Sequence, residues 1–307
     1  MKLKRVFGWI AVAIPLVATL ALAVGYWLSD NDCGKAAAPG VPMKAVTYCD
    51  YGTADVLRLE DVEKPVPGDD ELLVRVHAAG VNPLDWHYMR GTPYLMRLSS
   101  GLRKPKDTRL GVDYAGTVEA VGRNVTRFKP GDQVFGGRSG ALAQYVVAKQ
   151  DGAVALKPAN VSFEQAGAVA IAATTALQGL RDAGRLEAGD KVLINGASGG
   201  VGTFAVQIAK SMGAEVTAVC STRNVELVRS LGADHVVDYT RDDYTGVDAR
   251  YDVILDNVGN RSLAENRRVL EPDGRYVLIG GGGPEAGKWL GPMVKPLQAL
   301  VTSPFVS

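Results

Sequence analysis

A glycine-rich turn in the second half of the chain constrains the fold more than any other feature. Residues 192–194 form an apolar run typical of a buried strand, and residues 201–208 carry apolar side chains at helical spacing. Four glycines lie between positions 196 and 202. A strand, a tight turn and a helix N-terminus in this order place backbone N–H groups and the positive end of the helix dipole around a pyrophosphate. The pattern predicts a dinucleotide site, with a plain βα corner as the alternative.

The glycines have separate roles in this interpretation. Gly196 permits the turn, Gly199 lets the phosphates approach the backbone, and Gly202 lets the helix pack closely on the strand. The cofactor-binding residues expected in the turn are Gly196, Ser198, Gly199, Gly200, Val201 and Gly202.

The apolar pattern changes at about residue 161. From there to residue 307, strand-like and helical segments alternate, which predicts a Rossmann domain with a doubly wound parallel sheet. Residues 43–160 hold short alternating segments separated by turns, which predicts a compact antiparallel β-barrel. The expected strands of the second domain are residues 191–195, 215–220, 235–238, 251–256 and 275–279, and the expected helices are residues 163–180, 201–211, 224–231 and 262–270.

The N-terminus differs in composition. Residues 6–28 are uncharged and mainly apolar, and basic side chains precede them. This stretch is long enough to cross a bilayer, so we expect a single-pass transmembrane anchor over residues 1–30 and a linker over residues 31–42. A cleaved signal peptide is the alternative, because residues 21–23 resemble a cleavage site. The basic flank places the globular part outside the cytoplasm, whereas reduced nicotinamide cofactors are mainly cytosolic, so the side of the membrane stays open.

Charge and cysteine content exclude several classes of protein. Lys and Arg together number 34 against 33 for Asp and Glu, which gives no electrostatic case for a nucleic-acid partner. The three cysteines are Cys33, Cys49 and Cys220, and none forms a C-x-x-C pair. The spacing supports neither a disulfide framework nor a cysteine-rich zinc site.

Four motifs then occur in an order that a known family shares. They are residues 79–85 (AGVNPLD), residues 111–116 (GVDYAG), residues 129–132 (KPGD) and the glycine turn at 196–202. Together they resemble the zinc-independent medium-chain dehydrogenase/reductases, in their quinone oxidoreductase-like branch. The resemblance covers the chain from about Met43 and implies a GroES-like β-barrel domain followed by a Rossmann domain.

The same resemblance bears on metal content. Zinc-dependent relatives have a cysteine ligand where this chain has Asn82, and a His–Glu pair near Val112 and Asp113. Without a thiolate or an imidazole at these positions, Lewis-acid activation of an alcohol is not expected. We therefore expect no zinc, and hydride transfer with a nicotinamide cofactor as the reaction.

The resemblance also suggests catalytic residues. Residues matching Asn82 and Asp85 lie beside the nicotinamide in that branch, so Asn82 is expected to hydrogen-bond an acceptor oxygen. Asp85 is expected to orient its neighbours or to relay a proton. Both could instead serve turn chemistry around Pro83. Tyr94, with His87 and Tyr88 before it, is a candidate proton donor or a packing residue.

The end of the second Rossmann strand decides between NADPH and NADH. Enzymes that use NADH place an acidic residue there, whereas Ser221, Thr222 and Arg223 are suited to a 2′-phosphate. Helix capping is the alternative role for Thr222. We therefore expect NADPH, with NADH as the less favoured cofactor.

Further cofactor contacts are expected at other strand ends. By resemblance, the nicotinamide half would be lined by Thr174, Asn257, Val258, Ile279, Gly280 and Gly281, and Tyr239 would lie near the adenosine. Tyr145 and Lys149 match the dyad of short-chain dehydrogenases, but they precede the glycines and fall on an expected strand, so the match is a coincidence.

The sequence thus predicts a membrane-anchored NADPH-dependent oxidoreductase that reduces quinones or α,β-unsaturated carbonyls without zinc. An enoyl-thioester reductase, with the basic loop 97–109 holding a phosphorylated carrier, is one alternative, and a catalytically idle NADPH-binding protein at the membrane is another. The family admits a homodimer. Its members continue beyond the fifth Rossmann strand, so we expect the domain to be C-terminally incomplete, either as a fragment or as a natural truncation.

Overall fold

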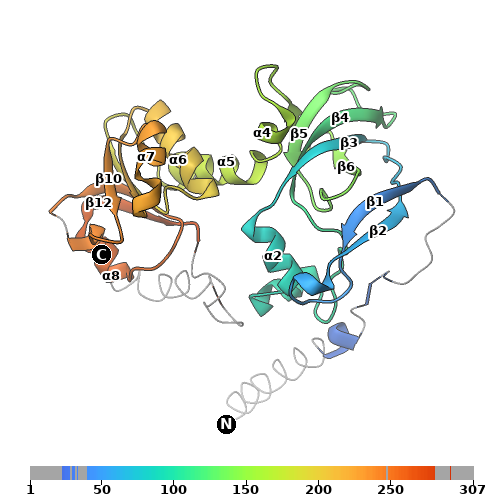
Figure 1. Ribbon diagram of the computed structural model, residues 1–307, viewed down its shortest axis with the longest axis horizontal. Helices are drawn as coiled ribbons and strands as arrows, with labels where there is room; N and C mark the ends of the chain where they lie inside the picture. The colour runs from blue at the N-terminus through green and yellow to red at the C-terminus, as the bar shows by residue number, and fades with distance from the viewer. Residues whose placement is uncertain are drawn as a thin grey trace, which may run out of the picture. The chain divides into compact units, whose positions relative to one another are not determined.

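The structure, a computed structural model, describes residues 23–27, 30, 31, 33, 40–246, 248–280 and 291. Contacts divide the chain into two compact units, one ending at Gly167 and the other beginning at Ala168. Figure 1 traces the first unit in blue to green and the second in yellow to red.

The first unit is built on antiparallel strands (Figure 1). Two strands form a small sheet, β1 (Pro42–Thr47) with β2 (Arg58–Glu63). A five-stranded sheet has the order β6-β3-β4-β5-β7. Its strands are β3 (Glu71–Gly80), β4 (Asp113–Val121), β5 (Gln133–Gly137), β6 (Tyr145–Lys149) and β7 (Val154–Leu156).

Short helices connect these strands. They are η1 (Ala54–Val56), α2 (Pro83–Arg90), η2 (Tyr94–Met96), α3 (Arg97–Ser100) and α4 (Phe163–Ala166). Alternate residues of the strands point into one core, which includes Leu72, Val74, Val118 and Val134. α2 directly follows β3 and precedes β4, so the NPLD motif lies at one end of this sheet.

The second unit holds a parallel sheet with the order β10-β9-β8-β11-β12. The strands are β8 (Lys191–Asn195), β9 (Glu215–Cys220), β10 (His235–Asp238), β11 (Tyr251–Asp256) and β12 (Leu270–Leu278). The helical segments are α5 (Ala170–Leu177), the π-helical η3 (Gln178–Ala183), α6 (Gly200–Ser211), η4 (Thr222–Asn224), α7 (Val225–Ser230), η5 (Tyr244–Gly246) and α8 (Leu263–Arg268).

Both faces of this sheet are covered. On one face, Ala205, Val206 and Ala209 of α6 pack with Val228 of α7 against the strands. On the other face, Tyr244 and Val269 pack against residues of β8, β9 and β11. The sequence of a central strand that is buried on both faces is a nearly continuous apolar run. This explains why residues 192–194 carry no polar side chain. The carboxyl ends of the strands consequently share one edge, where ligands bind in this class of sheet.

The predicted membrane anchor needs correction. Among the described residues, no helix has the length and apolar character needed to cross a bilayer. Within the predicted span, the structure describes residues 23–27, which are helical, and residue 30. The other residues of the span lie outside the described residues. The transmembrane helix at residues 1–30 and the single-pass membrane localisation are therefore wrong for the part of the chain that the structure describes.

Two smaller expectations also differ from the structure. The predicted helix over residues 163–180 is divided into α4, α5 and η3, and its break falls at Gly167, the last residue of the first unit. The cysteine spacing indicated no disulfide, yet Cys33 and Cys49 form one. Their spacing of 16 residues has no motif, because only the fold of the first unit brings the two segments together.

Candidate functional site

The glycine turn follows β8 and opens α6. Gly196 has a φ of +77°, a conformation that side-chain-bearing residues rarely adopt. Gly199 is the extended N-cap residue of α6, and its N–H donates to the carbonyl of Gly196 at 3.1 Å. The amides of the first helical turn, from Gly200 onward, have no partner within the helix by construction. These N–H groups can therefore donate hydrogen bonds to an anion bound at the positive end of the α6 dipole.

The space around each glycine separates packing from binding. A Cβ atom on Gly202 would lie 2.2 Å from the carbonyl oxygen of Gly196, so this glycine is needed for close packing. A Cβ on Gly199 would have its nearest neighbour at 3.4 Å, and one on Gly200 at 4.0 Å. Val201, the next residue, is half-buried. The turn is therefore open above Gly199 and Gly200 and closed beneath Gly202.

The loop after β9 meets the same turn. The side-chain amide of Asn224 donates to the Ser198 hydroxyl at 3.0 Å and to the Ser221 hydroxyl at 3.2 Å. The Arg223 side chain is exposed, and the described residues offer it no ion-pair partner. The Arg223 guanidinium and the Ser221 hydroxyl thus belong to a loop that is hydrogen-bonded to the glycine turn.

A carboxylate that was not predicted lies beside this loop. The Thr222 hydroxyl donates to Asp238 at 2.5 Å, at the end of β10. Hydrogen bonds from Thr222 and Thr240 outweigh partial burial and lower the pKa of Asp238, so it is ionised at neutral pH. Arg241 lies 3.7 Å from this carboxylate. Tyr239 follows it, is 58% exposed, and donates its backbone N–H to the Cys220 carbonyl at the end of β9.

A buried polar cluster holds the loop after β11. Asp256 is fully buried and accepts hydrogen bonds from the Asn195 side chain at 2.8 Å and from the Tyr276 hydroxyl at 2.7 Å. It also accepts the backbone N–H groups of Val258 and Gly259. Burial, followed by the bond to Asp256, raises the pKa of Tyr276 far above its usual range. The cluster fixes the shape of residues 256–259 at the edge where ligands bind.

Asn257 carries an unused acceptor at this edge. Its side-chain N–H donates to the Asn195 carbonyl at 3.0 Å, while its buried Oδ1 has no hydrogen-bond partner among the described residues. Buried polar atoms are rarely left unpaired, so this oxygen suits a donor group on a ligand. Val258 is 40% exposed and lies over Gly196, where a glycine Cβ would approach its Cγ2 to 2.8 Å.

The remaining predicted cofactor residues are less directly placed. The N–H groups of Ile279 and Gly280 donate to the Asp256 carbonyl, so the end of β12 adjoins the β11 loop. The Thr174 hydroxyl donates to the Ala170 carbonyl within its own helix and is exposed. Gly281 lies outside the described residues.

In the first unit, Asn82 and Asp85 are hydrogen-bonded to each other at the start of α2. The Asn82 backbone N–H donates to the Asp85 carboxylate at 2.7 Å, a helix-capping contact. The Asn82 side-chain N–H donates to Asp113 at 3.1 Å, and Asp113 is buried. Asp113 thereby sets the orientation of the Asn82 amide and leaves its second N–H hydrogen for another acceptor.

Asp85 itself is 2% exposed, and its Oδ1 has no hydrogen-bond partner among the described residues. Burial raises the pKa of Asp85, while the hydrogen bond from the Asn82 backbone amide opposes the shift.

A cavity of about 230 Å³ adjoins Asp85. Its lining surface is mainly apolar and includes two phenols and several charged or hydroxyl groups. The lining residues are Tyr48, Asp85, Tyr88, Ser99, Ser100, Lys106, Asp107, Arg109, Leu110, Gly111, Val112 and Ser139. Tyr94 is not among them, and the centre of its ring lies 4.6 Å from the Arg97 guanidinium. Of the three candidate proton donors, Tyr88 therefore lines the cavity.

The residues present fit a dinucleotide better than a metal. The open turn above Gly199 and Gly200 and the unpaired oxygen of Asn257 are features that a bound dinucleotide would fill. Across the described residues, no cluster of three or more His, Cys, Asp or Glu side chains could hold a metal ion. The absence of zinc stays a prediction.

Sequence reasoning missed several polar residues of these sites. Asn195 and Asp238 each end a β-strand, and a polar residue at the end of an apolar run is the signal that could have identified them. Asp113 and Tyr48 had no such signal, because their roles depend on contacts between segments distant in sequence.

Comparison with known proteins agrees with both units. Residues 68–159 match the family described as "Alcohol dehydrogenase GroES-like domain", and residues 200–301 match "Zinc-binding dehydrogenase". The quinone oxidoreductase of Sus scrofa is 35% identical over 252 residues, covering 79% of this chain and 74% of that protein. An NADPH-dependent alkenal/one oxidoreductase of Arabidopsis thaliana, described as chloroplastic, is 36% identical over 252 residues, covering 78% and 63%. The CurK enoyl reductase structure aligns with a TM-score of 0.72 and 29% identity, covering 78% and 75%.

The chain therefore belongs to the medium-chain dehydrogenase/reductase family, in its quinone oxidoreductase-like branch, which confirms the family predicted from the motifs. It spans 62% and 63% of the length of two of its curated relatives.

Proposed function

We propose that this protein is a zinc-independent, NADPH-dependent oxidoreductase that reduces quinones or α,β-unsaturated carbonyl compounds by hydride transfer. The observation that carries the proposal is the glycine turn that is closed beneath Gly202 and open above Gly199 and Gly200. Support comes from the relatives, whose names describe a quinone oxidoreductase and an NADPH-dependent alkenal/one oxidoreductase. When bound, the nicotinamide supplies the hydride.

The protein's own residues would bind and orient the reactants. The amides that open α6 would hold the pyrophosphate, and the unpaired Asn257 oxygen would accept a hydrogen bond from the cofactor. Asn82 would donate its second side-chain N–H hydrogen to the acceptor oxygen, where negative charge develops. Asp113 would keep the amide in the required orientation through its 3.1 Å contact.

The preference for NADPH would depend on the loop after β9. We propose that Arg223 pairs with the 2′-phosphate and that Ser221 donates a hydrogen bond to it. Thr222 is already bound to Asp238, so it is less available than the sequence indicated. The ionised Asp238 opposes a phosphate by charge, while Arg241 on the same loop offsets part of that charge and Thr240 donates a hydrogen bond to the carboxylate.

A panel of acceptors measured with both cofactors tests the proposal. Oxidation of NADPH is followed by absorbance with simple quinones, enones and alkenals as acceptors, and the measurements are then repeated with NADH in place of NADPH. We expect turnover with at least one class of acceptor and a lower KM for NADPH than for NADH. Binding of NADPH without turnover of any acceptor would instead support an idle cofactor-binding protein.

An enoyl-thioester reductase is a second candidate, favoured by the structural similarity to the CurK enoyl reductase. In this chain, Arg103 and Lys104 of the basic loop already pair with Asp30, which leaves Lys106 and Arg109 to meet a phosphorylated carrier. Turnover of a carrier-bound enoyl thioester much faster than of the free enone would support this candidate. Sedimentation of the same preparation tests whether the protein forms the homodimer that the family admits.

A further inference from the structure

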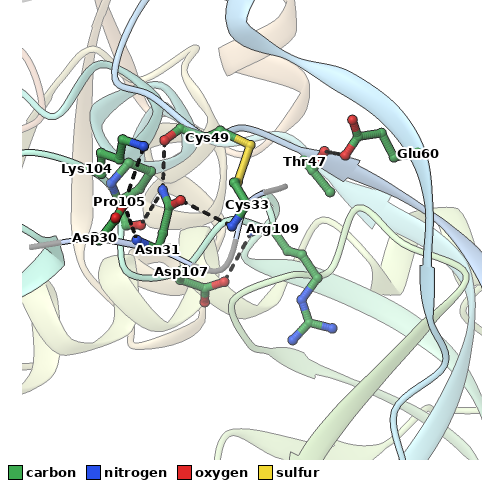
Figure 2. The surroundings of a disulfide bond; sticks show 10 residues. All are labelled: Asp30, Asn31, Cys33, Thr47, Cys49, Glu60, Lys104, Pro105, Asp107 and Arg109. Atoms are coloured by element: carbon green, nitrogen blue, oxygen red, sulfur yellow. Dashed lines mark hydrogen bonds and ion pairs between the residues drawn. A yellow bond between two sulfur atoms is a disulfide. The ribbon is translucent and has the colours of Figure 1, made fainter. Parts of the chain in front are cut away.

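A disulfide attaches a short N-terminal segment to the first unit. It joins Cys33 to Cys49, which lies just beyond the end of β1 (Figure 2). We call Asp30, Asn31 and Cys33 the N-terminal strap. Both cysteines are half-buried, so a small thiol in solution can approach the bond.

Asn31 joins the strap to two other segments at once (Figure 2). Its side-chain amide donates to the Cys49 carbonyl at 2.7 Å and to the Pro105 carbonyl at 3.2 Å. Its Oδ1 accepts the backbone N–H of Cys33 at 3.2 Å. One side chain therefore connects both partners of the disulfide to the loop that contains Pro105.

Asp30 adds a charged contact to the same loop. Its carboxylate lies 3.3 Å from the Lys104 ammonium and 3.9 Å from the Arg103 guanidinium. The backbone N–H of Asn31, followed by Lys104, lowers the pKa of Asp30, so this carboxylate is ionised at neutral pH. Exposed ion pairs contribute little to stability by themselves. The covalent bond is consequently the main restraint on the strap.

The strap contacts Cys49 and Pro105, which are next in sequence to residues that line the cavity beside Asp85. Tyr48, the neighbour of Cys49, lines the cavity, and so do Lys106 and Asp107, which follow Pro105. The Tyr48 backbone N–H donates to the Thr108 carbonyl at 2.9 Å, so these two lining segments are hydrogen-bonded to each other. A restraint on Cys49 and Pro105 is therefore a restraint on the width of this cavity.

We propose that the Cys33–Cys49 pair is a thiol-responsive latch that controls acceptor binding in this cavity. With the disulfide formed, the strap holds residues 103–109 against Tyr48. With the disulfide reduced, Asn31 is no longer held at the Cys49 and Pro105 carbonyls, and the loop opens more often. The link to acceptor binding depends on the proposed function, because the cavity adjoins Asp85, which caps the helix that Asn82 begins.

The switching reaction is thiol–disulfide exchange with a dithiol as the reductant. A thiolate of the dithiol attacks one sulfur of the pair, so the Cys33–Cys49 bond breaks and a mixed disulfide forms. The second thiol of the reductant then displaces the protein sulfur. Two electrons and two protons pass to the protein, which gains two thiols, and the dithiol leaves as its cyclic disulfide.

Hydrogen exchange tests the latch without requiring turnover. The full chain is compared before and after treatment with dithiothreitol, and alkylation followed by mass spectrometry reports which cysteines are reduced. The backbone amides of Tyr48 and Lys106, which donate to Thr108 and Ser100, report opening of the loop. We expect both amides to exchange roughly tenfold faster after reduction, while amides of β8 and β9 stay unchanged.

Kinetics test the second half of the proposal. Reduction is expected to raise the KM for the acceptor roughly three- to tenfold, with the Kd for NADPH unchanged, because the binding-competent loop becomes a smaller fraction of the population. Cys33→Ser should behave as the reduced protein in the presence or absence of dithiothreitol. Cys220→Ala removes the other, buried thiol and should keep the full response to reduction.

Unchanged exchange at Tyr48 and Lys106 after complete reduction would overturn the latch, whatever the enzymatic activity. Faster exchange with an unchanged acceptor KM would overturn control of binding in the cavity. Absence of turnover in the oxidised wild type would instead count against the proposed function, while the exchange result would still decide whether the latch exists.

Discussion

Two alanine substitutions in the glycine turn separate packing from cofactor binding. Gly202→Ala places a Cβ 2.2 Å from the carbonyl oxygen of Gly196, which is backbone and cannot rotate away. Gly200→Ala places a Cβ 4.0 Å from the Cβ of Ala172, which is ordinary van der Waals contact. Gly200 is already in helical conformation, as the first residue of α6. The two variants add the same methyl group, so each serves as the control for the other.

The expected effects on stability have opposite signs. Overpacking costs about 1–3 kcal/mol, so Gly202→Ala should lower the free energy of unfolding of the second unit by that amount. Gly200→Ala should leave it unchanged or raise it by about 0.4–1 kcal/mol, because alanine restricts the unfolded chain. Urea denaturation followed by circular dichroism, without cofactor, measures both effects.

The expected effect on cofactor binding is the loss of affinity in Gly200→Ala, the variant that is expected to keep its stability. The Gly200→Ala methyl group would occupy the open space above the turn, where a pyrophosphate approaches the backbone. We expect its Kd for NADPH to rise at least tenfold, or about 1.4 kcal/mol, in a fully folded protein. Wild-type NADPH affinity in Gly200→Ala would refute the location of the pyrophosphate. Wild-type stability in Gly202→Ala would refute the close packing of helix and strand.

Three further substitutions test single side chains. Arg223→Gln should raise the Kd for NADPH roughly tenfold or more and leave that for NADH unchanged, whereas Arg229→Gln, which removes an exposed arginine paired with Glu226, should affect neither in calorimetric titrations. Asn82→Ala should lower kcat about 10²- to 10³-fold without weakening NADPH binding, with Asn124→Ala as an exposed control, and equal losses in kcat from both would contradict the proposed role. Partial burial acts to raise the pKa of Asp234, but Lys210 at 2.8 Å and the Val216 amide outweigh it and lower that pKa. The stabilisation from Asp234 is therefore present above its unfolded pKa of 3.8 and is lost as the pH falls through the lower folded value, so urea midpoints of wild type and Asp234→Asn should converge at acid pH and differ near neutrality.

The second unit was largely predictable because its signals are local. Each parallel strand is an apolar run flanked by turns, and the expected strands at 191–195, 215–220, 235–238 and 251–256 coincide with β8, β9, β10 and β11. The glycine spacing also depends only on the chemistry of one turn. Sequence therefore locates the candidate cofactor turn without any knowledge of distant contacts.

The first unit and its cavity were less predictable for a physical reason. Tyr48, Asp85 and Arg109 come from segments that meet only after the sheets form. The pairing of Cys33 with Cys49 depends on the same long-range packing. Composition at the N-terminus predicted a membrane span, but no helix among the described residues has the length and apolar character for one.

The contacts of Asn195 join two loops at the binding edge of the second unit. Its carbonyl accepts both the backbone and the side-chain N–H of Asn257, and its side-chain amide donates to Asp256 and Asn260. The segments that follow β8 and β11 are therefore coupled through hydrogen bonds. A ligand contact that restricts the motion of one segment should also restrict the motion of the other. A coenzyme bound at one end of this edge would thus find the other end already ordered, with less entropy to lose there.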